Sequence, residues 1–151
     1  MSPSPLVFIT GASSGIGQAL AASFYQAGYR LALAARRTGE IETWAAAAQL
    51  DSSRYQVYSA DVAQTDSIIA AGAACIERQG LPDAVIANAG ISVGIDTAER
   101  EDIEVMARTF ATNNVGLMAT FHPFVAAMRK RGFSDRMIRE FKLSSSRKRL
   151  N

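Results

Sequence analysis

The sequence predicts an α/β fold, a doubly wound parallel sheet with its strands in the spatial order 3-2-1-4. Two observations carry this prediction. Short apolar runs alternate with longer helical patterns along the chain, and the turn after the first apolar run is rich in glycine. Strands and helices that alternate at this spacing form parallel sheets with right-handed crossovers. We expect one incomplete domain of this kind over residues 1–132 and a basic tail over residues 133–151.

The first strand is predicted at residues 6–9, an apolar run between prolines and glycines. The octet TGASSGIG follows at residues 10–17, and an Ala- and Leu-rich helix is expected over residues 18–27. In such a turn Gly11 can adopt backbone angles that other residues avoid. Gly15 would let a diphosphate approach the main chain, and Gly17 would let the helix pack closely on the strand. The unpaired N–H groups of the first helical turn suit an anion.

The remaining elements continue this alternation. Strands are expected over residues 29–35, 54–60 and 83–87, and helices over residues 40–50, 64–79 and 113–131. Residues 98–112 are expected to form one helix or two short ones. Pro123 should kink the last helix or begin a new segment. The strand order 3-2-1-4 makes this a Rossmann-type arrangement.

Composition favours a soluble globular chain, with 48% apolar and 20% charged residues. No apolar run approaches the roughly 18 residues that span a membrane, and the first residues lack the basic start of a secretory signal. Cys75 and His122 are each single, so neither a disulfide nor a cysteine or histidine cluster for a metal is expected. These features fit a cytoplasmic protein without a metal.

Charge divides the chain. Residues 1–128 hold seven Lys and Arg against twelve Asp and Glu, a net charge of −5. Residues 129–151 hold nine Lys and Arg against two Asp and Glu, a net charge of +7. A basic tract can bind nucleic acid, but we favour a solvated tail. A reading-frame change or truncation near Gly132 would explain the abrupt shift.

Two arginines, Arg36 and Arg37, follow the second predicted strand, where no carboxylate stands. At this position of a dinucleotide site an acidic residue binds a free ribose 2′-hydroxyl, whereas arginine accommodates a 2′-phosphate. The two arginines could also be solvated loop charges. Together with the glycine turn they favour NADP over NAD.

Two further motifs, Asp61-Val62 and Asn88-Ala89-Gly90, stand at the ends of the third and fourth predicted strands. Together with the octet, their order along residues 5–131 resembles the short-chain dehydrogenase/reductase family. The resemblance implies that Asp61 pairs with adenine, that Asn88 to Gly90 steady the sheet beside the cofactor, and that Asn113 helps to hold a proton-relay water. From the residues alone, Asp61 could instead be a helix N-cap, the Asn-Ala-Gly an ordinary turn, and Asn113 a capping residue.

The resemblance assigns Asn113 to catalysis and the following residues to cofactor binding: Thr10, Gly11, Ser13, Ser14, Gly15, Ile16, Gly17, Arg36, Arg37, Asp61, Val62, Asn88, Ala89 and Gly90. It implies hydride transfer between a carbonyl and an alcohol with NADP(H). The family's catalytic Tyr-x-x-x-Lys does not occur, since all four tyrosines precede residue 60 and the lysines stand at 130, 142 and 148. Ser144 to Ser146 stand roughly where the catalytic serine would fall, but no apolar run surrounds them.

We therefore expect a chain that holds the cofactor half of such an enzyme, lacks turnover and self-associates. A nucleotide-binding or partner-binding fragment is the alternative function, and a nucleic-acid binder that uses the basic tail is a less favoured one. The sequence does not identify the carbonyl or alcohol substrate.

Overall fold

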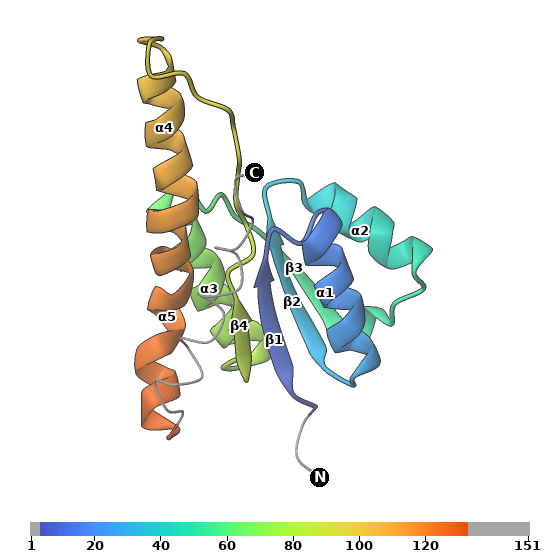
Figure 1. Cartoon of the computed structure of the whole chain (residues 1–151). Helices are drawn as coiled ribbons and strands as arrows, with labels where there is room; N and C mark the ends of the chain where they lie inside the picture. Colours follow the sequence, from blue (N-terminus) through green and yellow to red (C-terminus); the bar gives the residue numbers. More distant parts are fainter. Residues whose placement is uncertain (1–3, 133–151) are drawn as a thin grey trace.

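The computed structural model describes residues 4–132. Four parallel strands form one sheet in the order β3-β2-β1-β4. Helices flank both faces of this sheet (Figure 1). The predicted Rossmann-type α/β fold and the strand order 3-2-1-4 are thus confirmed. The expected tail at residues 133–151, including Ser144 to Ser146, lies outside the described residues.

β1 (Leu6–Thr10) lies between β2 (Arg30–Ala35) and β4 (Ala84–Ile86), and β3 (Tyr55–Ser59) pairs with the far side of β2. Every residue of β1 is buried. The register places Phe8 beside Ala32 on one side and Val85 on the other. A strand buried on both faces needs a continuous apolar run, which is why β1 was recognisable from sequence.

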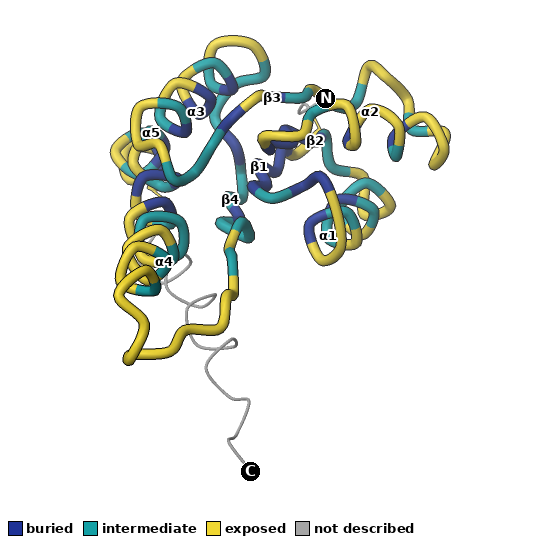
Figure 2. Tube along the Cα trace, turned by 90° about the horizontal axis from the view of Figure 1, so that it is seen from above, coloured by how far each residue is buried: buried dark blue, intermediate teal, exposed yellow. Residues whose placement is uncertain are grey.

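Two helical layers cover the sheet (Figure 2). α1 (Gly15–Gln26) and α2 (Thr38–Ala47) lie on one face, where Val7, Ile9, Leu31 and Leu33 form a core. α3 (Thr65–Gln79) and α5 (Gly116–Lys130) lie on the other, where Phe8 packs on Phe124 with their ring centroids 4.9 Å apart. Successive strand residues supply opposite cores because their side chains alternate between the two faces.

One long helical rod is formed by α4 (Asp102–Phe110), a π-helical segment (Ala111–Val115) and α5. The predicted boundary between residues 112 and 113 therefore falls inside a continuous helix. α5 also runs through Pro123, so no new segment begins there. Pro123 instead packs against α3, where a Cβ on Gly72 would collide with its ring.

Helix ends differ from the predictions for local reasons. α1 begins at Gly15, three residues earlier than predicted. α2 stops at Ala47 because Gln49 has a left-handed φ of 53°. α4 starts at Asp102 rather than residue 98, because Asp96 and Asp102 fold the preceding turns through their side chains: Asp96 accepts from the backbone of Ala98, and Asp102 from that of Asp96.

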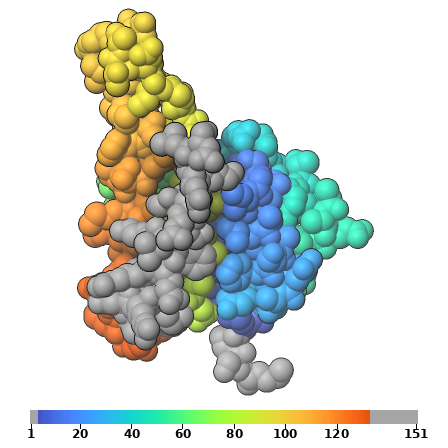
Figure 3. Space-filling view, viewed as in Figure 1, coloured from blue at the N-terminus to red at the C-terminus, as the bar shows by residue number. Residues whose placement is uncertain are grey.

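The α4 end of the rod projects beyond the sheet, as the space-filling view shows (Figure 3). No helix among residues 4–132 combines the length and the apolar character that a membrane crossing requires. Cys75 lies on α3 and is fully buried in the core, and His122 is exposed on α5.

Candidate functional site

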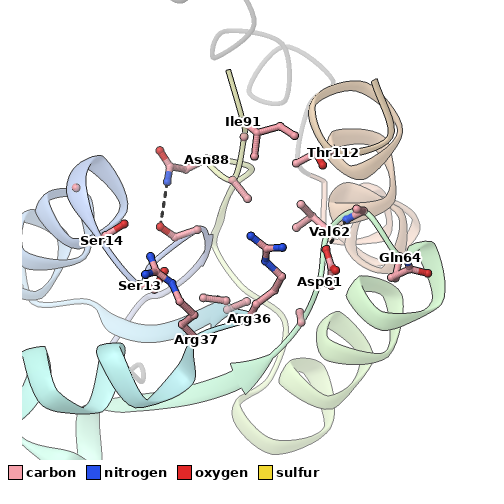
Figure 4. A pocket seen from close by; sticks show the side chains of 18 of the residues that line it. Ser13, Ser14, Arg36, Arg37, Asp61, Val62, Gln64, Asn88, Ile91 and Thr112 are labelled. Carbon is pink, nitrogen blue, oxygen red and sulfur yellow. Dashed lines mark hydrogen bonds between the residues drawn. The ribbon is translucent and has the colours of Figure 1, made fainter. Parts of the chain in front are cut away.

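A cavity of about 680 Å³ opens at the carboxyl ends of the strands. In open parallel sheets this edge, near the point where strand order reverses, is where ligands bind. Its walls come from the glycine turn, the ends of β2, β3 and β4, and α4 (Figure 4). Twelve of the predicted site residues line it: Gly11, Ser13, Ser14, Gly15, Ile16, Arg36, Arg37, Asp61, Val62, Asn88, Ala89 and Gly90. Thr10, Gly17 and Asn113 do not line it, but each contacts a residue that does.

The glycine turn is shaped by close backbone contacts. Gly11 has a φ of 69°, and a Cβ there would lie 2.9 Å from Cα of Ala89. A Cβ on Gly17 would overlap the carbonyl oxygen of Gly11, so α1 approaches the turn only because this residue is glycine. Gly15, with a φ of 54°, faces open space instead. The turn thus leaves room for a ligand directly above its backbone.

The start of α1 is open toward the cavity. Ser14, its N-cap, is extended and makes no side-chain capping bond, and the first turn holds no acidic residue. Backbone N–H groups there lack helical partners and carry the positive end of the helix dipole. This arrangement suits a phosphate.

The two arginines after β2 differ in their contacts. Arg37 Nη1 lies 2.9 Å from Glu40 Oε1, an exposed i,i+3 ion pair. Arg36 lines the cavity without a hydrogen bond or ion pair to any residue of the described range, and its side chain extends into the open space (Figure 4). Arg36 is therefore the freer of the two cations.

Asp61 organises the turn after β3. Its Oδ1 accepts a hydrogen bond from the backbone N–H of Ala63 at 3.0 Å, and its own N–H donates to Ser67 Oγ at 3.0 Å. α3 begins later, with Gln64 at its N-cap. The alternative that Asp61 is a helix N-cap is therefore wrong.

Asn88, Ala89 and Gly90 join the end of β4 to the end of β1. Asn88 Nδ2 donates to the carbonyl oxygens of Thr10 at 3.1 Å and Gly11 at 3.4 Å. The backbone N–H of Ala89 donates to Thr10 Oγ1 at 3.1 Å. The motif is thus a cross-link that fixes the glycine turn, which an ordinary surface turn would not do.

Asn113 lies in the π-helical segment and faces the chain that leaves β4. Its Oδ1 accepts from the backbone N–H of Ile91 at 2.8 Å, and its Nδ2 donates to the carbonyl oxygen of Ile91 at 2.7 Å. The N-caps of α4 and α5 are Glu101 and Val115, so Asn113 is not a capping residue. π-Helical turns are rare and concentrate at functional sites.

Sequence reasoning missed part of the cavity wall. Ile91 and Val93 line it from the segment after β4, and Val105, Arg108 and Thr112 line it from α4 and the π-helical segment. A signal existed for the helical group, since spacings of three and four residues place side chains on one face. No comparable pattern marks Ile91.

An open parallel sheet with a glycine turn and an open helix start at the carboxyl ends of its strands is typical of nucleotide-binding α/β proteins of the Rossmann class. The family model described as short chain dehydrogenase matches residues 5–135. This chain belongs to the short-chain dehydrogenase family, whose members bind a nicotinamide cofactor and act as oxidoreductases on small molecules.

Individual relatives support this family assignment. A "Dehydrogenase/reductase SDR family protein 7-like" of Drosophila melanogaster is 37% identical over 134 residues, which cover 86% of this chain and 41% of the relative. An X-ray structure of an alcohol dehydrogenase from Thermococcus sibiricus, complexed with 5-hydroxy-NADP, is 29% identical with a TM-score of 0.76. The alignment covers 85% of this chain and 55% of that one.

A third structure shares the fold. It is a 3-ketoacyl-(acyl-carrier-protein) reductase from Brucella melitensis complexed with NADH, 24% identical with a TM-score of 0.75, covering 85% of this chain and 51% of that one. The chain thus spans about half the length of the solved structures that it resembles and two fifths of the Drosophila relative.

Proposed function

We propose that this chain binds NADP(H) in the cavity, as the cofactor-binding part of an oxidoreductase that interconverts carbonyls and alcohols. One observation carries the preference for the phosphorylated cofactor. Arg36 lines the cavity at the end of β2 with its guanidinium uncommitted, and Glu40, the first carboxylate after that strand, is held by Arg37. A planar guanidinium suits a phosphate, and no free carboxylate stands there for a 2′-hydroxyl.

The rest of the nucleotide follows the walls of the cavity. The diphosphate would lie over Gly15 and the N–H groups that begin α1, and the adenine beside Asp61 and Val62. Asn88 to Gly90 would lie beneath the ribose. Thr10 and Gly17 hold this frame from behind, through the Ala89 hydrogen bond and the contact with the Gly11 carbonyl.

Bound nicotinamide would supply the hydride transfer, and this chain's residues would bind and orient it. Asn113 would support the site by fixing Ile91 rather than by touching the reacting atoms. Since no Tyr-x-x-x-Lys occurs in the 151 residues, we propose that this chain alone does not turn over substrate. A positioned acid or base is typically worth about 10²–10⁴-fold in rate. NADPH oxidation assayed with a panel of carbonyls tests this, and a steady rate abolished by Gly15→Trp would contradict it.

Cofactor titration tests the binding proposal. Wild type should bind NADPH more tightly than NADH, and Arg36→Ala should remove most of that preference. Arg37→Ala is the matched control, because Arg37 is already paired with Glu40 and should contribute less. Equal affinities of the wild type for the two cofactors would refute the proposal.

We also propose that the chain self-associates along the rod. Ile103, Met106, Phe110, Val115 and Met118 are exposed apolar residues there, and Met118 is 76% accessible. Their spacings are 3, 4, 5 and 3 residues, with the step of five spanning the π-helical segment, so they form one stripe. Such a stripe on a soluble chain indicates a contact surface.

We also propose a cytoplasmic location, which the single, buried Cys75 supports.

A further inference from the structure

A second cation, Arg108, reaches the cavity from the rod. We propose that Arg108 is a specificity-determining residue that contacts the 2′-phosphate of NADP(H) from the wall opposite the glycine turn. This inference rests on the proposed NADP site and adds a residue that none of the sequence motifs contains. Its argument begins with the face of the rod on which Arg108 stands.

Val105, Arg108 and Thr112 all line the cavity. Their spacings of three and four residues place them on one side of α4 and the π-helical segment. Gly116 continues the same series one step further. This is a different side of the rod from the exposed apolar stripe, whose members are offset from these positions.

The lower end of this series is fixed at the adenosine end of the cavity. A Cβ on Gly116 would collide with the carbonyl oxygen of Val62, so the start of α5 touches the turn after β3. Figure 4 shows Thr112 and Val62 on the same side of the cavity, with Ser13 and Ser14 across from them and Arg36 between. Arg108 stands one turn beyond Thr112, on the wall that rises from the Asp61-Val62 turn.

The charges at this end are unbalanced. The ionisable residues that line the cavity are Arg36, Arg37, Arg108 and Asp61. Arg37 is paired with Glu40, and Asp61 Oδ1 accepts from Ala63. Arg37–Glu40 is the one ion pair between residues within 4–132, so Arg108 is not paired with Glu104, one turn earlier on α4.

Two guanidinium groups of the cavity wall, those of Arg36 and Arg108, therefore remain uncommitted. The diphosphate already has the start of α1 on the opposite wall, where the helix dipole favours it. At the adenosine end of the nucleotide the 2′-phosphate is the anionic group, and NAD lacks it. Arg108 thus favours the phosphorylated cofactor for the same reason as Arg36. Its exposed position predicts a smaller effect, since solvent screens an exposed charge.

Adenosine 2′,5′-bisphosphate and 5′-ADP are suitable probes because they carry the adenosine end without nicotinamide. Affinities would be measured by calorimetry for the wild type, Arg36→Ala, Arg108→Ala and Arg108→Lys at low and moderate salt. Arg100→Ala is the matched control, an exposed arginine just before α4 that does not line the cavity. Circular dichroism would verify that each variant is folded like the wild type.

We expect Arg108→Ala to weaken binding of the 2′,5′-bisphosphate about three- to tenfold and binding of 5′-ADP less than twofold. Arg108→Lys should retain most of the affinity, Arg100→Ala should match the wild type, and salt should reduce the difference. If Arg36→Ala lowers the preference while Arg108→Ala does not, or if Arg108→Ala weakens both probes equally, the role of Arg108 is overturned and the NADP site stands. If the wild type does not prefer the 2′,5′-bisphosphate, both the site and the inference fail.

Discussion

Asn113 and Ile91 are joined by two hydrogen bonds, in which the side-chain amide of Asn113 both accepts from and donates to the backbone of Ile91 at 2.8 and 2.7 Å. This is the pairing that a neighbouring strand would make, supplied by one side chain. It ties the π-helical segment of the rod to the chain that leaves β4. Since Ile91 lines the cavity, the position of the rod and the shape of the site are coupled.

Asn113→Asp should weaken the link between the rod and Ile91. A carboxylate keeps the acceptor but replaces the amide donor with an oxygen, which repels the carbonyl oxygen of Ile91. An unsatisfied, partly buried group costs about 1–3 kcal/mol, and we expect the free energy of unfolding to fall by that amount. Denaturant unfolding would measure it. Asn114→Asp, at the exposed neighbouring position of the same segment, should change stability little. Equal effects of the two substitutions would show that the Ile91 hydrogen bonds contribute nothing.

Gly17→Ala should damage the glycine turn although alanine favours helices. The new Cβ would collide with the carbonyl of Gly11, a backbone atom that cannot swing away. We expect a loss of about 2 kcal/mol or more in the free energy of unfolding and weaker nucleotide binding.

Gly39→Ala is the matched control for that substitution. Gly39 is also helical, in α2, but a Cβ there would meet nothing within 4 Å. Alanine should stabilise α2 by about 0.5–1 kcal/mol. Thermal unfolding should therefore shift in opposite directions for the two variants. A Gly17→Ala protein as stable as the wild type would mean that α1 can move away from the turn freely.

Alkaline pH should destabilise the protein through Tyr58 and Cys75. Burial raises the pKa of Tyr58 from 10.0 to about 12, and burial also raises the pKa of Cys75 from 9.0 to about 12. Between about pH 9 and 12 the unfolded chain therefore holds fewer protons on these groups than the folded chain. The stability that they contribute is fully present below about pH 9 and is lost as the pH rises toward 12.

Denaturant unfolding under reducing conditions at pH 7, 9 and 10.5 would measure this loss. Cys75→Ala should lower stability at pH 7, because a buried side chain is shortened, but should flatten the decline above pH 9. Tyr58→Phe removes the hydroxyl that donates to Gln79 at 2.9 Å and should flatten the decline above pH 10. A decline equally steep in both variants and the wild type would assign the pH dependence to other groups.

The sequence predicted the sheet and its order because each strand leaves a clear local signal. Every residue of β1 is buried, so the apolar run at 6–9 was a clear sign of a central strand. Glycines were also informative, since the close contacts at Gly11 and Gly17 admit no other residue. Fold and glycine turn were therefore predictable from local pattern.

The rod was predicted less well. Asn113 was placed at a helix boundary, whereas it lies inside a π-helical segment whose i→i+5 bonding has no distinct residue pattern. The hydrogen bonds between Asn113 and Ile91 use only the backbone of Ile91. Because every residue has these backbone groups, the residue type at position 91 could not reveal the contact. The apolar residues of the predicted helix over 113–131 lie on different sides of the rod. Phe124 and Met128 are buried, whereas Val115 and Met118 are exposed.

The exposed stripe of the rod should make the chain associate with itself. Phe110 and Met118 are 55% and 76% accessible, and burying such side chains against a second copy is worth about 25 cal/mol per Å² of apolar surface. Phe110→Glu with Met118→Glu should shift the protein toward monomer in light scattering, because a carboxylate in such a contact would lose its hydration.

The edge of β4 offers a second surface for self-association, since within residues 4–132 β4 pairs with β1 alone and presents unpaired backbone groups. Ala46→Glu is the matched control, an exposed position of α2 on the opposite face of the sheet from the rod, and should leave association unchanged. A wild-type chain that runs as a sharp 16.2 kDa monomer with a cooperative thermal transition would contradict self-association altogether. A double variant that associates as strongly as the wild type would move the contact from the stripe to the edge of β4.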